Sequence, residues 1–301
     1  NAKAAIFQKN LTVGFSNRYQ ISQSISNNTI FYGAFAQVKN SAIRNYERRN
    51  EPSAGARTLF SWEKKTSADN SIKITAGSEL QGGWYNTMVS KNKNGNPDTV
   101  LTNDDIQYWG YNVFLQADLI LDNSWFINGG VSFNQSRVNF SRLSNYPVLR
   151  QSRTYQNEMA PRVSMRKNFK NGWAVKGTIS RGFSPPTVAE LLPSTGIIST
   201  NLEAEEGWNY EATLIYRLLK NKLTLEATGF YFKLNNALVQ RRDVSGADFF
   251  INAGDTRQKG IELSADYFTS FRRGILESFI LNSSWPLNHF RYGHFVQGAD
   301  N

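Results

Sequence analysis

The residues that could catalyse a reaction or hold a metal ion are few in this chain. It has 301 residues and no cysteine, which excludes disulfides, thiolate metal sites and cysteine nucleophiles. Its two histidines, His289 and His294, lie in an aromatic, turn-rich segment near the C-terminus, where ordinary loop side chains are the usual interpretation. Two such histidines leave little for a zinc site or a serine–histidine–aspartate arrangement. We therefore expect no catalysis, no bound metal and no cofactor.

Two clusters of oxygen-bearing side chains are better explained as loop structure. Glu203, Glu205 and Glu206 resemble a group of catalytic carboxylates, but they fall where a loop meets a strand, and we expect them to be exposed. The segment 92–98 resembles half of a calcium loop, yet it lacks the closing bidentate glutamate at the expected spacing. A plain turn is the favoured interpretation of this second cluster.

The side chains best suited to binding are arginines and aromatic residues in polar segments. Arginine binds carboxylate and phosphate groups with planar, bidentate geometry. Aromatic rings stack on flat ligands at low entropic cost. For each such residue the competing interpretation is an ordinary solvated loop side chain. The candidate ligand-binding residues are Trp84, Tyr85, Tyr146, Arg150, Arg153, Tyr155, Arg241 and Arg242.

The basic charge of the chain is spread along it rather than gathered on one element. The formal net charge is +10, and dense runs occur only at 44–49, 241–242 and 272–273. A nucleic-acid reader concentrates its lysines and arginines on one face or helix. We therefore expect no nucleic-acid partner, whereas lipid headgroups or an electropositive mouth that attracts anionic ligands both suit this charge.

The elements that must position these residues are amphipathic strands. In 208–218, the even positions from Tyr210 to Leu218 are apolar or aromatic, and the positions between them include Asn209 and Glu211. This period-two alternation indicates a strand with one apolar and one polar face, and about twelve segments show it. The sequence contains no run of 18 apolar residues, so it predicts no transmembrane helix. A membrane-spanning barrel, however, needs only about 9–11 alternating residues per strand.

Short turns alternate with long polar connections along the chain, which is typical of an up-and-down outer-membrane barrel. Trp125 and Trp173 follow short turns, and Trp208 adjoins a long loop, as expected for two aromatic girdles. The alternative is a soluble sandwich or β-helix, since aromatic residues flank strands in many β proteins. The only helix-like piece is 187–192. We expect the long loops, with every candidate residue at their rim, at 39–55, 82–105, 138–157, 184–206, 236–254 and from 287 onward.

Several short motifs in the second half resemble one known family. They are Gly-Phe-Ser-Pro-Pro-Thr at 182–187, Asn-Leu-Glu at 201–203, Trp-Asn-Tyr-Glu at 208–211, Asn-Ala-Gly at 252–254 and Lys-Gly-Ile-Glu at 259–262. As a set they resemble the C-terminal half of the barrel of a TonB-dependent outer-membrane receptor. The resemblance is clear over 158–300, and the preceding residues match only in their barrel pattern.

The resemblance implies an all-β fold: an antiparallel up-and-down transmembrane β-barrel, of which this chain carries about twelve of about 22 strands. Residues 1–301 then form the barrel portion, and the N-terminal plug and TonB box lie outside the chain, which we interpret as a fragment of a longer mature protein. The resemblance places that protein in the outer membrane of a Gram-negative bacterium. Its partners would be membrane lipid and, through the absent N-terminal part, the TonB–ExbB–ExbD complex.

The resemblance also implies energised uptake of a scarce ligand, for which a ferric siderophore is our preferred interpretation. The iron chelate is then the transported small molecule, and it is not a cofactor of the protein. Haem, cobalamin, a glycan or ferric citrate are other ligands of the family. A passive porin or an adhesin is the alternative outside it. An outer-membrane protease or lipase would need a compact catalytic set, which the sequence does not offer.

Overall fold

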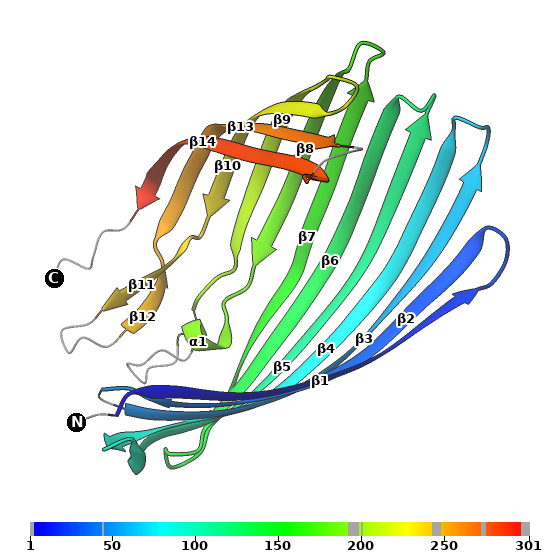
Figure 1. The fold of residues 1–301 in the computed structure, drawn as a ribbon. Coiled ribbons are helices and arrows are strands. Elements are labelled where there is room, and N and C mark those ends of the chain that lie inside the picture. The colour runs from blue at the N-terminus through cyan, green and yellow to red at the C-terminus, as the bar shows by residue number, and fades with distance from the viewer. Residues whose placement is uncertain are drawn as a thin grey trace.

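The computed structural model describes residues 3–43, 45–191, 199, 201–242, 248–271 and 275–295, and these residues are almost entirely β-structure (Figure 1). No helix among them is long and apolar enough to span a membrane. The strands are β1 (Ala5–Gln20), β2 (Ile25–Ser41), β3 (Asn45–Lys65), β4 (Ser71–Lys93), β5 (Asn96–Leu121), β6 (Trp125–Arg142), β7 (Arg150–Asn168), β8 (Trp173–Ser184), β9 (Glu205–Leu218), β10 (Leu223–Asn235), β11 (Leu238–Arg242), β12 (Asp248–Asn252), β13 (Gly254–Ser270) and β14 (Ser278–Phe295).

Twelve of these strands form one antiparallel sheet in chain order. Each strand from β1 to β10 pairs with its neighbour in sequence, β10 then pairs with β13, and β13 pairs with β14. The strands β11 and β12 form a separate hairpin between β10 and β13. This order confirms the all-β, antiparallel, up-and-down prediction. Within the described residues the sheet is a curved open wall, in which β1 and β14 each pair on one side (Figure 1).

The two faces of the sheet differ in polarity, as the alternation predicts. We call outer the face that carries Leu115, Leu214 and Leu225, whose side chains are 52%, 45% and 39% exposed. The opposite, inner face carries charged residues such as Glu79 and Glu211. A monomer in water rarely exposes so much contiguous apolar surface. An apolar outer face opposite a polar inner face is typical of a membrane-facing sheet.

Short connections join the strands at one end of the sheet, which we call the turn rim. Asp122 and Asn123 both have positive φ, 51° and 47°, as a type I′ hairpin turn requires. Gly172 has φ +88°, and a Cβ there would lie 2.5 Å from the carbonyl oxygen of Arg217. The connections 122–124, 169–172 and 219–222 are short, which confirms the short turns expected before Trp125 and Trp173.

At the other end, the loop rim, several predicted loops are wrong because strands run through them. The expected loop 39–55 is mostly β2 and β3, which are separated by three residues, and 82–105 is mostly β4 and β5. These two strands meet at Asn94 and Gly95, with φ of 56° and 87°. Period-two alternation depends on one face being buried. Where strands extend past the apolar belt, both faces are polar and the pattern disappears.

The remaining predicted loops are confirmed in part. Only 143–149 connect β6 to β7, and β14 continues through the loop expected from 287, as far as Phe295. The connection 185–204 is long as predicted, and the short helix α1 (Val188–Leu191) lies where a helical piece is expected. Thr187 and Glu190 cap it reciprocally, each side-chain oxygen accepting from the other residue's backbone N–H at 3.3 and 2.6 Å.

Aromatic rings on the inner face lie flat over glycines of neighbouring strands. Gly55 pairs with Tyr32, and a Cβ at Gly55 would overlap the tyrosine ring. A Cβ at Gly207 would lie 2.5 Å from the ring of Phe232. The Tyr32 hydroxyl donates to Glu79 at 3.1 Å. The rings therefore line the wall instead of projecting into the space that it encloses.

Candidate functional site at the loop rim

A small hydrophobic core lies on the inner face at the loop rim. It forms because the connection between β8 and β9 folds back onto β5 and β6, bringing Leu191 and Leu202 against Ile106, Val138 and Phe140. These five residues, which we call the mouth cluster, are at most 5% exposed. The residues Tyr85, Tyr108, Leu238 and Phe250 pack against them. Figure 1 shows α1 and the β11–β12 hairpin at the same end of the sheet.

The side chain of Asn252 joins the β8–β9 connection to the β11–β12 hairpin. Its Oδ1 accepts from the backbone N–H of Glu203 at 2.8 Å. Its Nδ2 donates to the backbone oxygens of Glu203 at 3.0 Å and Asn236 at 2.7 Å. The backbone N–H of Leu238 also donates to Glu205 Oε1 at 2.6 Å. The motifs at 201–203 and 252–254, which the sequence separates by about fifty residues, are therefore in direct contact.

A second set of contacts anchors the same connection to β7. The Tyr155 hydroxyl, which is buried, donates to the backbone oxygen of Leu202 at 3.1 Å. Arg153 Nη2 donates to Glu203 Oε1 at 2.6 Å, and its guanidinium lies 5.2 Å from the centre of the Tyr155 ring. Arg153 is 26% exposed, so a ligand at the mouth could reach it by competing with Glu203.

A hollow of about 750 Å³ lies at the loop rim beside Tyr85. Asp104 receives a bidentate pair from Arg142 at 2.8 and 3.1 Å, and Arg49 lies 3.6 Å from Glu51. The formal charges of this lining nearly balance. The hollow can therefore offer hydrogen bonds to a polar ligand. Its charged and aromatic lining consists of Glu47, Arg49, Glu51, Tyr85, Asp104 and Arg142.

The structure divides the predicted site residues between the two faces. Tyr85, Arg153 and Tyr155 lie on the inner face, around the mouth cluster and the hollow. Trp84 lies on the outer face, where its ring meets Trp109 edge-on at 5.4 Å between centroids.

Arg150 also lies on the outer face, where it donates to Gln107 Oε1 at 2.9 Å. A register shift between β6 and β7 at Asn134/Ser136 reverses the alternation of β7 at this end. Tyr146 is 99% exposed in the 143–149 connection. Arg241 and Arg242 are adjacent on β11, so they point to opposite sides of that hairpin.

Sequence reasoning did not select the residues that build the mouth. Asn252 and Leu202 belong to the quoted motifs, but nothing in those motifs showed that they meet. Val138 and Phe140 are alternate apolar residues in a segment that we expected to be a loop, and Ile106 directly follows another expected loop. Their spacing of two, as in Val138 and Phe140, was the available signal for a strand with a buried face. Among the described residues, no group of three His, Cys, Asp or Glu side chains could hold a metal ion.

Comparison with known protein families shows to which family the chain belongs. The model of the family described as "TonB dependent receptor-like, beta-barrel" matches residues 3–300. The chain belongs to the TonB-dependent receptor family. Among curated proteins, none matches the chain. The family match extends over the first half as well, where the motifs of the sequence gave no clear resemblance.

Several solved structures share the fold of this receptor barrel. The ferric citrate transporter FecA is 15% identical with a TM-score of 0.73, over 96% of this chain and 44% of that chain. The siderophore receptor PiuA from Acinetobacter baumannii is 10% identical with a TM-score of 0.74, over 99% and 49%. The copper transporter OprC is 14% identical with a TM-score of 0.73, over 95% and 48%. The receptor chain therefore spans less than half of each structure, and at these identities the likeness shows the fold alone.

Proposed function

We propose that the chain is the barrel portion of a Gram-negative outer-membrane receptor that imports a ferric siderophore with energy from the TonB–ExbB–ExbD complex. The complex would act through the part of the protein that precedes this barrel. The ferric chelate is the transported ligand, and the barrel catalyses no reaction. Family membership and the apolar outer face support the membrane placement. The observation that carries the proposal is the loop-rim mouth, where two connections meet over a polar inner wall.

The mouth offers groups that suit an anionic, partly aromatic chelate. Arg153 and the β11 arginines can bind carboxylate or catecholate oxygens, and Tyr85 can pack against flat ligand groups. Tyr146 is exposed in a neighbouring connection. Trp84 and Arg150 face outward and are not part of the proposed contact surface. Tyr155 is buried and anchors the β8–β9 connection, so the proposed ligand contacts are Tyr85, Tyr146, Arg153, Arg241 and Arg242.

The test of the function is growth on defined iron sources. Deletion of the gene should abolish growth on one or more ferric siderophores as the sole iron source, and a strain without TonB should show the same defect. Normal growth of the deletion strain on every ferric siderophore, with lost uptake of haem or copper, would transfer the proposal to that ligand. Uptake that persists without TonB would indicate a passive porin.

The test of the site compares arginines on the two faces of the barrel. In the full receptor, Arg153→Ala and the double variant Arg241→Ala/Arg242→Ala should each weaken binding of the imported chelate by about 1.5–3 kcal/mol, roughly tenfold or more. Arg150→Ala is the matched control, because it removes the same side chain from the outer face of the same strand. Glu203→Gln separates two roles of Arg153. It should strengthen binding if Arg153 contacts the anion, and weaken binding if Arg153 only anchors the loop.

A further inference from the structure

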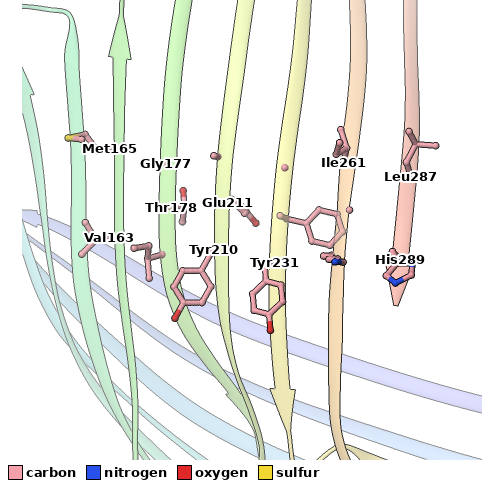
Figure 2. A pocket seen from close by; sticks show the side chains of 16 residues that line it. Val163, Met165, Gly177, Thr178, Tyr210, Glu211, Tyr231, Ile261, Leu287 and His289 are labelled. Carbon is pink, nitrogen blue, oxygen red and sulfur yellow. The ribbon is translucent and has the colours of Figure 1, made fainter. Parts of the chain in front are cut away.

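A shallow apolar hollow of about 920 Å³ lies on the outer face, away from the mouth (Figure 2). Its floor is a row of small residues, Gly177, Ala212 and Gly229, which lie side by side across β8, β9 and β10. No heavy atom would lie within 4 Å of a Cβ at Gly177 or Gly229. The missing side chains therefore leave open space on the apolar outer face. The walls of the hollow include Met165, Ile179, Tyr210, Tyr231, Ile261 and Leu287.

Basic side chains line the loop-rim side of this hollow on the same outer face. Lys233 pairs across the sheet with Arg257, and Arg257 pairs with Arg291. One step of two residues along the strands toward the hollow, Lys259 pairs with His289. Both of these side chains line the hollow. All five side chains are exposed. Neighbouring strands are about 4.8 Å apart, so the first three cations lie in a row only about 10 Å long.

Like charges directly opposite each other in a sheet repel, so a bound anion would stabilise this row. The Asp255 carboxylate lies 3.9 Å from Arg257, and its Oδ1 also accepts from the backbone N–H of His294 at 2.7 Å. Trp208 and Tyr210 lie in the same band with ring centroids 6.4 Å apart, as aromatic residues do at a membrane interface. The apolar hollow thus lies toward the middle of the apolar belt, and the cations lie at its boundary.

We propose that this outer-face site binds a phosphorylated lipid of the outer leaflet. Lys233, Arg257, Lys259 and Arg291 would hold the phosphate, and one acyl chain would fill the hollow over Gly177 and Gly229. The occupant follows from complementarity, because an apolar hollow adjoins a cationic band on the face that we place against lipid. The inference rests on the proposed membrane placement, but not on which ligand the receptor imports.

The test is native mass spectrometry of the full receptor, delipidated in neutral detergent and titrated with phosphatidic acid. Phosphatidylcholine with the same acyl chains tests the need for an anionic headgroup, and glycerol phosphate tests the headgroup without chains. We expect phosphatidic acid to bind at least about tenfold more tightly than phosphatidylcholine. Each charge-assisted contact is worth about twice a neutral hydrogen bond, so neutralising the row should weaken binding by about tenfold or more. The variant for this arm is Lys233→Gln/Arg257→Gln/Lys259→Gln/Arg291→Gln.

A second variant fills the hollow without touching the charges. Gly177→Leu/Gly229→Leu should weaken phosphatidic acid binding several-fold and leave glycerol phosphate binding unchanged. Both substitutions place apolar side chains in open space, and heat-modifiable migration on gels checks that the barrel is folded. If this variant binds phosphatidic acid as tightly as the parent, the acyl-chain hollow is refuted.

A matched control carries the same change in charge at the turn rim. It replaces four exposed lysines by glutamine: Lys64, Lys65, Lys170 and Lys220. This control should bind phosphatidic acid like the parent. Equal losses in both quadruple variants, or equal affinity for the two lipids, would overturn the headgroup site. The titrations contain no iron chelate, so their failure is distinguishable from failure of the import proposal.

Discussion

Replacing Asn252 by alanine should loosen the mouth without unfolding the barrel. The change removes three hydrogen bonds, two with Glu203 at 2.8 and 3.0 Å and one with Asn236 at 2.7 Å. Each is worth about 0.5–1.5 kcal/mol, so their sum is at most about 4.5 kcal/mol. Asn252 is only half-buried, and water replaces part of what is lost. We expect the contact between connection and hairpin to weaken by about 1–3 kcal/mol, or about 5–150-fold in its opening equilibrium.

Hydrogen–deuterium exchange of the full receptor in detergent measures this loosening segment by segment. Amides in 201–206 and 236–254 should exchange faster, whereas the strands of the wall should not change. Asn252→Asp should give an intermediate result, because it keeps the acceptor for the Glu203 N–H and loses both donors. Asn209→Ala is the matched control, since the Asn209 amide bonds Glu211 on its own strand at 2.7 Å. Unchanged exchange in both segments, or faster exchange throughout the sheet, would refute the role given to Asn252.

Three further substitutions test other parts of the wall by denaturant unfolding or exchange. Arg142→Ala leaves the carboxylate of Asp104, which is 6% exposed, without its bidentate partner, and should lower the free energy of unfolding by about 3–5 kcal/mol. The double change to Arg142→Leu with Asp104→Leu should recover most of that loss. Gly172→Ala places a Cβ against a carbonyl oxygen at positive φ and should cost about 1–3 kcal/mol, while Gly182→Ala, with open space around its Cβ, should cost much less. Tyr155→Phe removes one buried hydroxyl donor, so exchange in the β8–β9 connection should increase by a factor equivalent to about 0.5–1.5 kcal/mol, and no increase would contradict the anchor.

The membrane-level part of the fold was predictable because lipid on one side and polar groups on the other enforce a period of two. Leu214 belongs to the apolar face predicted for 208–218, and in the structure it lies on the outer face. Beyond the apolar belt both faces are polar, so the period of two is lost. The parts of these strands in 39–55 and 82–105 could therefore not be recognised from the sequence. The Asn94-Gly95 pair was the remaining local signal, because this dipeptide favours a two-residue hairpin turn.

The candidate site was predictable in residue type but not in orientation. Trp84 and Tyr85 are adjacent, so strand alternation alone requires that only one of them face inward, and Leu80 fixes Trp84 as outward. Arg150 and Arg153 could not be assigned this way, because the register shift near Ser136 reverses the alternation of β7. A bulge of this kind leaves no reliable mark in the sequence. The contact of Asn252 with Glu203 depends on how two connections fold against each other, so it also could not be predicted from the sequence.

The rings that lie over glycines on the inner face carry a consequence for how relatives of this barrel can diverge. Gly55 and Tyr32 occupy one shared space, as do Gly207 and Phe232, so a larger residue at either glycine is compatible only with a smaller one at its partner. Selection should remove single substitutions that enlarge either glycine, whereas replacements at both members of a pair should be tolerated. Aligned homologous barrels should therefore show compensating volume changes at 32 and 55, and at 207 and 232. Such covariation would preserve the bore of the wall while its amino acids drift.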